Sequence, residues 1–118
     1  MNSYLPGIHL IATLQTHQTN LIATHEGFGS CIQQLIQQFN LTNLGSVFHN
    51  FSPAGFTAVV CLSESHISIH TWPEFGKINL DIYLSNFKRN NDGTVHAIFK
   101  ELVLFFDATI VEQHLIQR

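Results

Sequence analysis

Three stretches of alternating apolar residues between positions 56 and 84 constrain the fold of this chain more than any other feature. Their apolar positions are Phe56, Ala58, Val60 and Leu62, then Ile67 and Ile69, then Ile78, Leu80, Ile82 and Leu84. A period of two is typical of strands that bury one face. Ser-Pro and Ser-Glu breaks separate extended segments at about 45–51, 55–62 and 66–72, and a fourth runs from about 77 to 85. The pattern predicts an antiparallel sheet with one apolar face.

Two stretches with helical spacing are expected to cover that face. Between Phe28 and Phe39, apolar residues recur at i, i+3, i+4, i+7, i+8 and i+11, and Ser30 and Gln33 are placed as a capping box at the helix start. The same spacing recurs at 95–106. We therefore expect two amphipathic helices packed on the apolar side of the sheet.

The rest of the chain supplies shorter elements and loops. A first strand is predicted at 8–14 and a short last strand from about Thr109. Lys88 and Arg89 fall in a polar loop and are expected to be solvated. Cys31 lies on the apolar stripe of the first helix and is expected to serve packing.

The second face of the predicted sheet carries a different kind of residue. Its positions are Thr57, then His66, Ser68 and His70, then Asn79, Asp81, Tyr83 and Ser85. These groups form hydrogen bonds and perform chemistry, and few of them are the Lys and Glu residues of a solvated face. Only 11% of the chain is charged, against 45% hydrophobic. We expect a ligand or a second protomer on this face, and hence a homo-oligomer.

Charge and composition exclude several classes of function. Five basic residues and a net charge of -3 leave no basic patch for nucleic acid. No apolar run approaches the roughly 20 residues that span a bilayer. Cys31 and Cys61 lack the spacing of a metal site, and the N-terminus lacks the features of a signal peptide. We expect a protein of the cytoplasm that binds neither membrane nor nucleic acid.

One segment of the sequence relates the residues of the polar face to a known type of reaction. Leu62-Ser63-Glu64-Ser65-His66-Ile67-Ser68-Ile69-His70-Thr71-Trp72-Pro73-Glu74, with Phe48-His49-Asn50-Phe51-Ser52-Pro53 upstream, resembles the self-cleavage region of the prokaryotic S-adenosylmethionine decarboxylases. These proenzymes convert one of their own serines into a pyruvoyl cofactor. By this resemblance the serine is Ser65, and cleavage between Glu64 and Ser65 yields chains 1–64 and 65–118.

The resemblance extends from Gly7 to Ala108 but is specific only at residues 48–76. The fold that it implies is a two-layer α+β sandwich, an antiparallel β-sheet with two helices packed on one face. Residues 1–118 would form a single domain. Two processed protomers would pair as a homodimer.

The same resemblance implies the roles of individual residues. In processing, Thr57 donates a hydrogen bond to the tetrahedral oxyanion and His70 is the base for the elimination that follows. In substrate binding, Phe51 stacks on the adenine, Glu74 binds the ribose and Glu64 contacts the substrate. A stacked aromatic ring and a carboxylate on a diol suit an adenosyl group.

The position of His70 raises a geometric question. Residues 66 and 70 of a strand point to the same side, so His70 is expected to reach Ser65 only through a bend near Glu64.

The implied activity is decarboxylation of S-adenosylmethionine to the aminopropyl donor of spermidine biosynthesis. The substrate amine would form a Schiff base with the pyruvoyl ketone, which then accepts the electrons left by CO2. The family usually has a cysteine twenty residues after the cleaved serine, as the acid that reprotonates the product. This chain has Ser85 there. A hydroxyl is a poor acid near neutral pH, so His66, His70 and Tyr83 are alternative donors.

Other functions stay open at this point. A pyruvoyl-dependent ornithine or arginine decarboxylase would use Asp81 or Glu74 to bind the side-chain cation. A non-processing regulatory paralogue would fold and dimerise without cleavage. Zinc bound by His49, His66 and His70 lacks a cysteine pair or nearby acidic ligand, so no metal is expected. A hydrolase triad of Ser65, His70 and Asp81 lacks the Gly-x-Ser-x-Gly turn.

Overall fold

The computed structural model describes residues 4–118 and consists of one sheet and two main helices. In chain order the elements are β1 (Ile8–Thr16), η1 (Thr19–Leu21), α1 (Glu26–Gln38), β2 (Asn43–Asn50), β3 (Phe56–Leu62), β4 (Ser65–Trp72), η2 (Pro73–Phe75), β5 (Lys77–Leu84), α2 (Asp92–Phe105) and β6 (Ala108–Gln117). No helix among these residues is long and apolar enough to cross a membrane.

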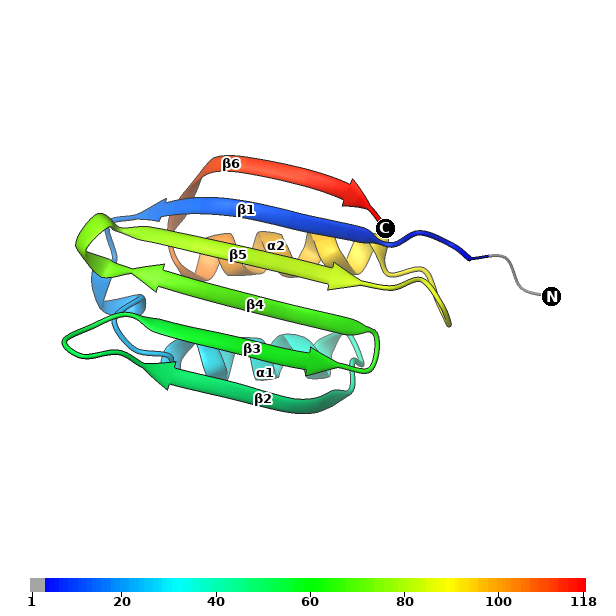
Figure 1. Ribbon diagram of the computed structural model, residues 1–118, viewed down its shortest axis with the longest axis horizontal. Coiled ribbons are helices and arrows are strands. Elements are labelled where there is room, and N and C mark those ends of the chain that lie inside the picture. The colour runs from blue at the N-terminus through cyan, green and yellow to red at the C-terminus, as the bar shows by residue number, and fades with distance from the viewer. Residues whose placement is uncertain (1–3) are drawn as a thin grey trace.

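The six strands form one antiparallel sheet in the order β2-β3-β4-β5-β1-β6. Both helices lie on the same side of it, α2 behind β1 and β5, and α1 behind β2 and β3 (Figure 1). The predicted α+β two-layer sandwich is therefore confirmed. The last strand is longer than expected, because β6 runs for ten residues along β1 and returns the C-terminus to the N-terminal end of β1.

The core lies between the helices and the apolar sheet face. All ten apolar positions that the alternation placed on this face are buried. Phe28 of α1 links the two layers, with its ring 5.8 Å from that of Phe56 and 6.3 Å from that of Phe106. Truncation of such a fully buried ring to alanine typically costs about 3–5 kcal/mol. Cys31 packs against this core, and burial raises the pKa of its thiol.

The start of α1 differs from the sequence expectation. The helix begins at Glu26, so Ser30 lies inside it and forms no capping box with Gln33. Asn50, at the end of β2, supplies the missing contacts: its Oδ1 accepts the His25 N–H at 2.8 Å and its Nδ2 donates to Glu26 at 3.0 Å. A long-range contact thus replaces the local cap.

The turns between strands gather at two ends of the sheet. The β3–β4 turn and the connection from β5 to α2 lie at one end, while the β2–β3 turn and η2 lie at the other (Figure 1). Gly76 is required at the second end, because its φ is +61° and a Cβ there would lie 2.5 Å from the Thr16 carbonyl oxygen. The polar face between these ends is uncovered by any helix.

Candidate active site

Ser65 occupies the first position of β4, directly after the β3–β4 turn. Its φ is +139°, a region that costs a residue with a Cβ of order 1–3 kcal/mol. Its Oγ lies 3.3 Å from Nδ1 of His66. The carbonyl oxygen of Glu64 accepts a hydrogen bond from the Ser85 N–H at 2.7 Å. The peptide bond before Ser65 is thus strained, next to a nucleophile, and polarised by a backbone donor.

The side chain of Glu64 is held in place. Arg89 donates to its two carboxylate oxygens at 3.0 and 3.2 Å, and the fully buried Asn91 donates to the same carboxylate and, at 2.8 Å, to the Ser85 carbonyl. Burial would raise the pKa of Glu64, but the hydrogen bonds and the guanidinium charge outweigh it and the pKa is lowered. The carboxylate is therefore ionised and fixed.

Arg89 is exposed, as expected, but its guanidinium also makes specific contacts within the chain. Besides Glu64, its guanidinium donates to the carbonyls of Phe39 and Asn40 at 3.1 and 3.0 Å. These carbonyls follow the C-terminus of α1, where backbone acceptors lack helical partners and favour a cation. The Arg89 side chain thus links the end of α1 to the Ser65 end of the sheet.

Thr57 and His70 lie opposite one another on β3 and β4. Their side chains are joined by a hydrogen bond of 2.6 Å between Oγ1 and Nδ1. They line a cavity of about 370 Å³ together with Phe51, Trp72 and Glu74. Aromatic walls beside a carboxylate and a histidine are features of a small-molecule pocket.

The two groups of residues lie far apart within one chain. Ser65 and His70 are five positions apart on β4, about 16 Å at the usual rise of a strand. The pairing of β4 with β3 and β5 is continuous from Ser65, so the bend expected near Glu64 does not bring His70 to Ser65. Glu64, Ser65 and Ser85 therefore form one part of the candidate site, and the pocket residues form another at the opposite end.

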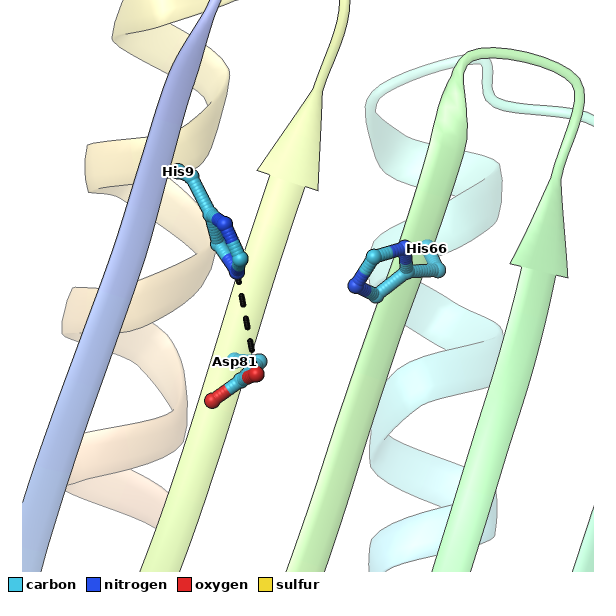
Figure 2. A group of neighbouring side chains, drawn as sticks. All are labelled: His9, His66 and Asp81. Atoms are coloured by element: carbon cyan, nitrogen blue, oxygen red, sulfur yellow. Dashed lines mark ion pairs between the residues drawn. The ribbon is translucent and has the colours of Figure 1, made fainter. Parts of the chain in front are cut away.

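A third group joins His66 and Asp81, which the sequence placed on the polar face, to His9, which it did not identify. His9 of β1 lies 3.7 Å from Asp81 of β5, measured from Nε2 to Oδ2 (Figure 2). One nitrogen each of His9 and His66 and one oxygen of Asp81 lie within 4.8 Å of one another. His9 has the polar parity of β1, but only the placement of β1 beside β5 brings it to this cluster.

The zinc set considered from the sequence does not assemble. His66 and His70 lie four positions apart on one straight strand, about 13 Å, which is too far for a shared metal ion.

Comparison with known proteins places these features in a family. The family model described as S-adenosylmethionine decarboxylase matches residues 8–118. The S-adenosylmethionine decarboxylase proenzyme of Archaeoglobus fulgidus is 46% identical over 77 residues, 65% of this chain and 69% of that protein. The proenzyme of the same name from Picrophilus torridus is 38% identical over 96 residues, 81% of this chain and 74% of that protein. The crystal structure of the adenosylmethionine decarboxylase from Aquifex aeolicus VF5 matches with a TM-score of 0.85 and 27% identity, over 98% of this chain and 92% of that one. The chain therefore belongs to the S-adenosylmethionine decarboxylase family.

Proposed function

We propose that this chain cleaves itself between Glu64 and Ser65 and then decarboxylates S-adenosylmethionine, which yields the aminopropyl donor for spermidine biosynthesis. The observation that carries the proposal is the peptide bond at Ser65, which is strained and polarised in a member of this decarboxylase family. A pyruvoyl group at residue 65 supplies an electron sink for loss of the substrate carboxylate. Family membership favours this substrate over ornithine or arginine and favours an enzyme over a non-processing paralogue.

The pocket residues suit the adenosyl part of the substrate. Phe51, which is half exposed, and Trp72 both line the cavity, and an aromatic ring there can stack on a purine. Glu74 offers a carboxylate for the ribose hydroxyls. The proposal assigns adenine stacking to Phe51 and ribose binding to Glu74, while Glu64 contacts the substrate near the reacting centre.

The two parts of the site meet if a second copy packs on the polar face. A two-fold axis between the sheets and across the strands would place the Ser65 end of one protomer opposite the pocket end of the other. Exposed Val47, Val59 and Ile116 share this face with the polar groups, which supports burial against a partner. Thr57 and His70 of the partner subunit would then supply a second oxyanion donor, beside the Ser85 N–H, and the elimination base at Ser65.

Ser85 stands where reprotonation of the product is expected. It follows Leu84, the residue that pairs with Ser65, and so lies beside the cleaved bond. We propose Ser85 as a slow proton donor, since its hydroxyl is a weak acid compared with a thiol. Ser85→Cys should therefore raise the decarboxylation rate and the number of turnovers before inactivation. Equal values in both forms would exclude this role.

The enzyme is proposed to act in the cytoplasm, where the thiols of Cys31 and Cys61, which form no disulfide, stay reduced.

The proposed function is tested by intact mass and CO2 release. Purified protein is analysed under denaturing conditions and then given labelled S-adenosylmethionine, ornithine or arginine, with Ser65→Ala as the uncleavable control. We expect chains of residues 1–64 and 65–118, the second blocked to Edman sequencing, and CO2 from S-adenosylmethionine alone. A single inert chain of 13.3 kDa would overturn the proposal. CO2 from ornithine or arginine would overturn the substrate but keep the cleavage.

A further inference from the structure

We propose that His66 is the base that takes the Ser65 Oγ proton at the start of self-cleavage, and that Asp81 stabilises the resulting imidazolium. This inference rests on the proposed function, because it concerns the first step of cleavage at Glu64-Ser65. It is separate from the role of His70, which belongs to the later elimination and lies at the far end of β4.

The geometry at Ser65 satisfies the first requirement of such a base. Nδ1 of His66 lies 3.3 Å from Oγ of Ser65, within reach of a short approach to a full hydrogen bond. The bond under attack already has its oxyanion donor, since the Ser85 N–H contacts the Glu64 oxygen at 2.7 Å. Nucleophile, base and oxyanion donor are thus present within one chain.

The opposite side of the His66 ring faces a carboxylate. Figure 2 shows the imidazole extending from β4 toward Asp81 and His9. Nε2 of His9 is buried, has no hydrogen-bond partner among the described residues, and points at Asp81. Nδ1 of His9 faces the Arg118 guanidinium at 3.4 Å and therefore acts as an acceptor, which leaves the His9 proton on Nε2, toward Asp81. Asp81 thus lies beside both histidines, and its negative charge is placed to stabilise a protonated His66, as a carboxylate does for the histidine of a serine-histidine pair.

The protonation state of His66 suits a base. Burial, and then the neighbouring His9 and Arg118, lower the pKa of His66, while Asp81 opposes them. The groups that face His66 are Asp81 and Tyr83 of β5, His9 of β1, Arg118 after β6 and Cys61 of β3. The imidazole is consequently neutral near pH 7 and free to accept a proton.

The step balances without any other reactant. The Ser65 Oγ–H bond breaks and its proton passes to Nδ1 of His66 while Oγ bonds to the carbonyl carbon of Glu64. The oxyanion is held by the Ser85 N–H. The carbon–nitrogen bond then breaks, and His66 returns the proton to the Ser65 nitrogen. The products are an ester and an amine, and the strain at the positive φ of Ser65 is released.

The same three side chains have the chemistry of a metal site, but one contact opposes it. Arg118 places a positive charge 3.4 Å from the His9 ring, where it would repel a divalent cation. A chelator therefore belongs in the test.

The two histidines are distinguished by where cleavage stops. Wild type, His66→Ala and His70→Ala are made by cell-free translation, and samples are treated with hydroxylamine, which cleaves an ester but not an amide. We expect His66→Ala to process at least 100-fold more slowly than wild type and to resist hydroxylamine. His70→Ala should instead accumulate a chain that hydroxylamine splits before Ser65. His96→Ala, an exposed histidine of α2, is the matched control and should process normally.

Two further measurements separate catalysis from folding. Added imidazole should restore part of the cleavage of His66→Ala, which a misfolded chain would not show. Asp81→Asn should slow processing and move the rising limb of its pH profile to lower pH, because loss of the carboxylate lowers the pKa of His66 further.

Several outcomes would overturn the inference. Processing of His66→Ala at the wild-type rate, or accumulation of the hydroxylamine-sensitive ester by this variant, excludes His66 as the first base. Loss of wild-type cleavage in EDTA, with recovery on added zinc, would make the cluster a metal site instead. An uncut wild-type chain would mean that the proposed function has failed, not this assignment alone.

Discussion

Both ends of β4 carry polar residues of the candidate site, but the side chains at the two ends differ in their contacts and exposure. At the Ser65 end, Glu64 is held by Arg89 and by Asn91, which is 0% exposed. At the pocket end, His70 is exposed and Phe51 is 50% exposed, beside an open cavity of about 370 Å³. Contacts within the chain fix the Ser65 end, whereas the pocket end stays open to a substrate, and by our proposal each end needs the opposite end of a partner subunit.

The difference has a chemical reason. By our proposal the bond before Ser65 cleaves itself, and such a bond needs its nucleophile and carbonyl fixed before reaction. The part-buried hydrogen bonds from Asn91 to Glu64 and to the Ser85 carbonyl serve this end. A pocket for a substrate must stay open until binding. By our proposal the two ends are therefore separate within one chain and come together only across the two chains of a dimer.

The largest expected effect is complementation between two inactive variants. Ser65→Ala and His70→Ala should each remain uncut alone. When the two are coexpressed, the partner's His70 reaches an intact Ser65, and under random pairing about half of the His70→Ala chains should be cleaved. Distinct tags and intact mass provide the readout. His70→Ala chains that stay uncut in the mixture would show that the two ends do not meet across the dimer.

Loss of the Asn91 side chain should have the second largest effect. Asn91→Ala removes the donor to Glu64 and to the Ser85 carbonyl, two part-buried acceptors of which Glu64 keeps only its contacts with Arg89, at a cost of about 1–3 kcal/mol. Urea unfolding in the Ser65→Ala background measures the free energy without cleavage. Asn20→Ala, at an exposed asparagine of η1, is the control. Equal stability of the two variants would mean that the Ser65 end is no more rigid than the surface.

Removal of one aromatic wall should affect substrate binding alone. Phe51→Ala should raise KM about 2- to 12-fold, since stacking contributes about 0.5–1.5 kcal/mol, and leave self-cleavage intact. Steady-state CO2 release measures the change. Phe87→Ala, an exposed phenylalanine near the Ser65 end, should keep the wild-type KM. A rise in KM for both variants would show that substrate binding does not depend on the pocket end alone.

The smallest effect concerns acid stability. The pKa of Glu64 is lowered in the folded chain, so its ionisation stabilises the fold above the usual carboxyl range, and this contribution is lost as the pH falls through the lowered pKa. In the Ser65→Ala background, Glu64→Gln should lose less stability than its parent below about pH 5. Urea midpoints from pH 7 downward provide the measurement, with Glu101→Gln on α2 as control. Parallel curves for all three proteins would contradict the lowered pKa.

Local sequence patterns were sufficient to predict the helices and strands of this protein and the buried face of its sheet. The alternation at 56–84 determined which side chains are buried, because a strand turns each successive residue to the opposite face. The self-cleavage motif likewise determined the family. The capping box at Ser30 failed because a distant asparagine, Asn50, could hold the start of α1 instead. A local signal is overridden when a tertiary contact satisfies the same backbone groups.

Only the tertiary structure decided how the site is divided. The sequence motif led us to propose Ser65 and His70 as residues that carry the chemistry, five positions apart along the chain. Their separation to opposite ends arises because an extended strand advances about 3.3 Å per residue. His9, Arg89 and Asn91 join the Ser65 end from β1 and from the loop before α2, and no local pattern records such pairings. Residues close in sequence can therefore lie far apart along a strand, while pairing in the sheet brings residues from distant strands close together in space.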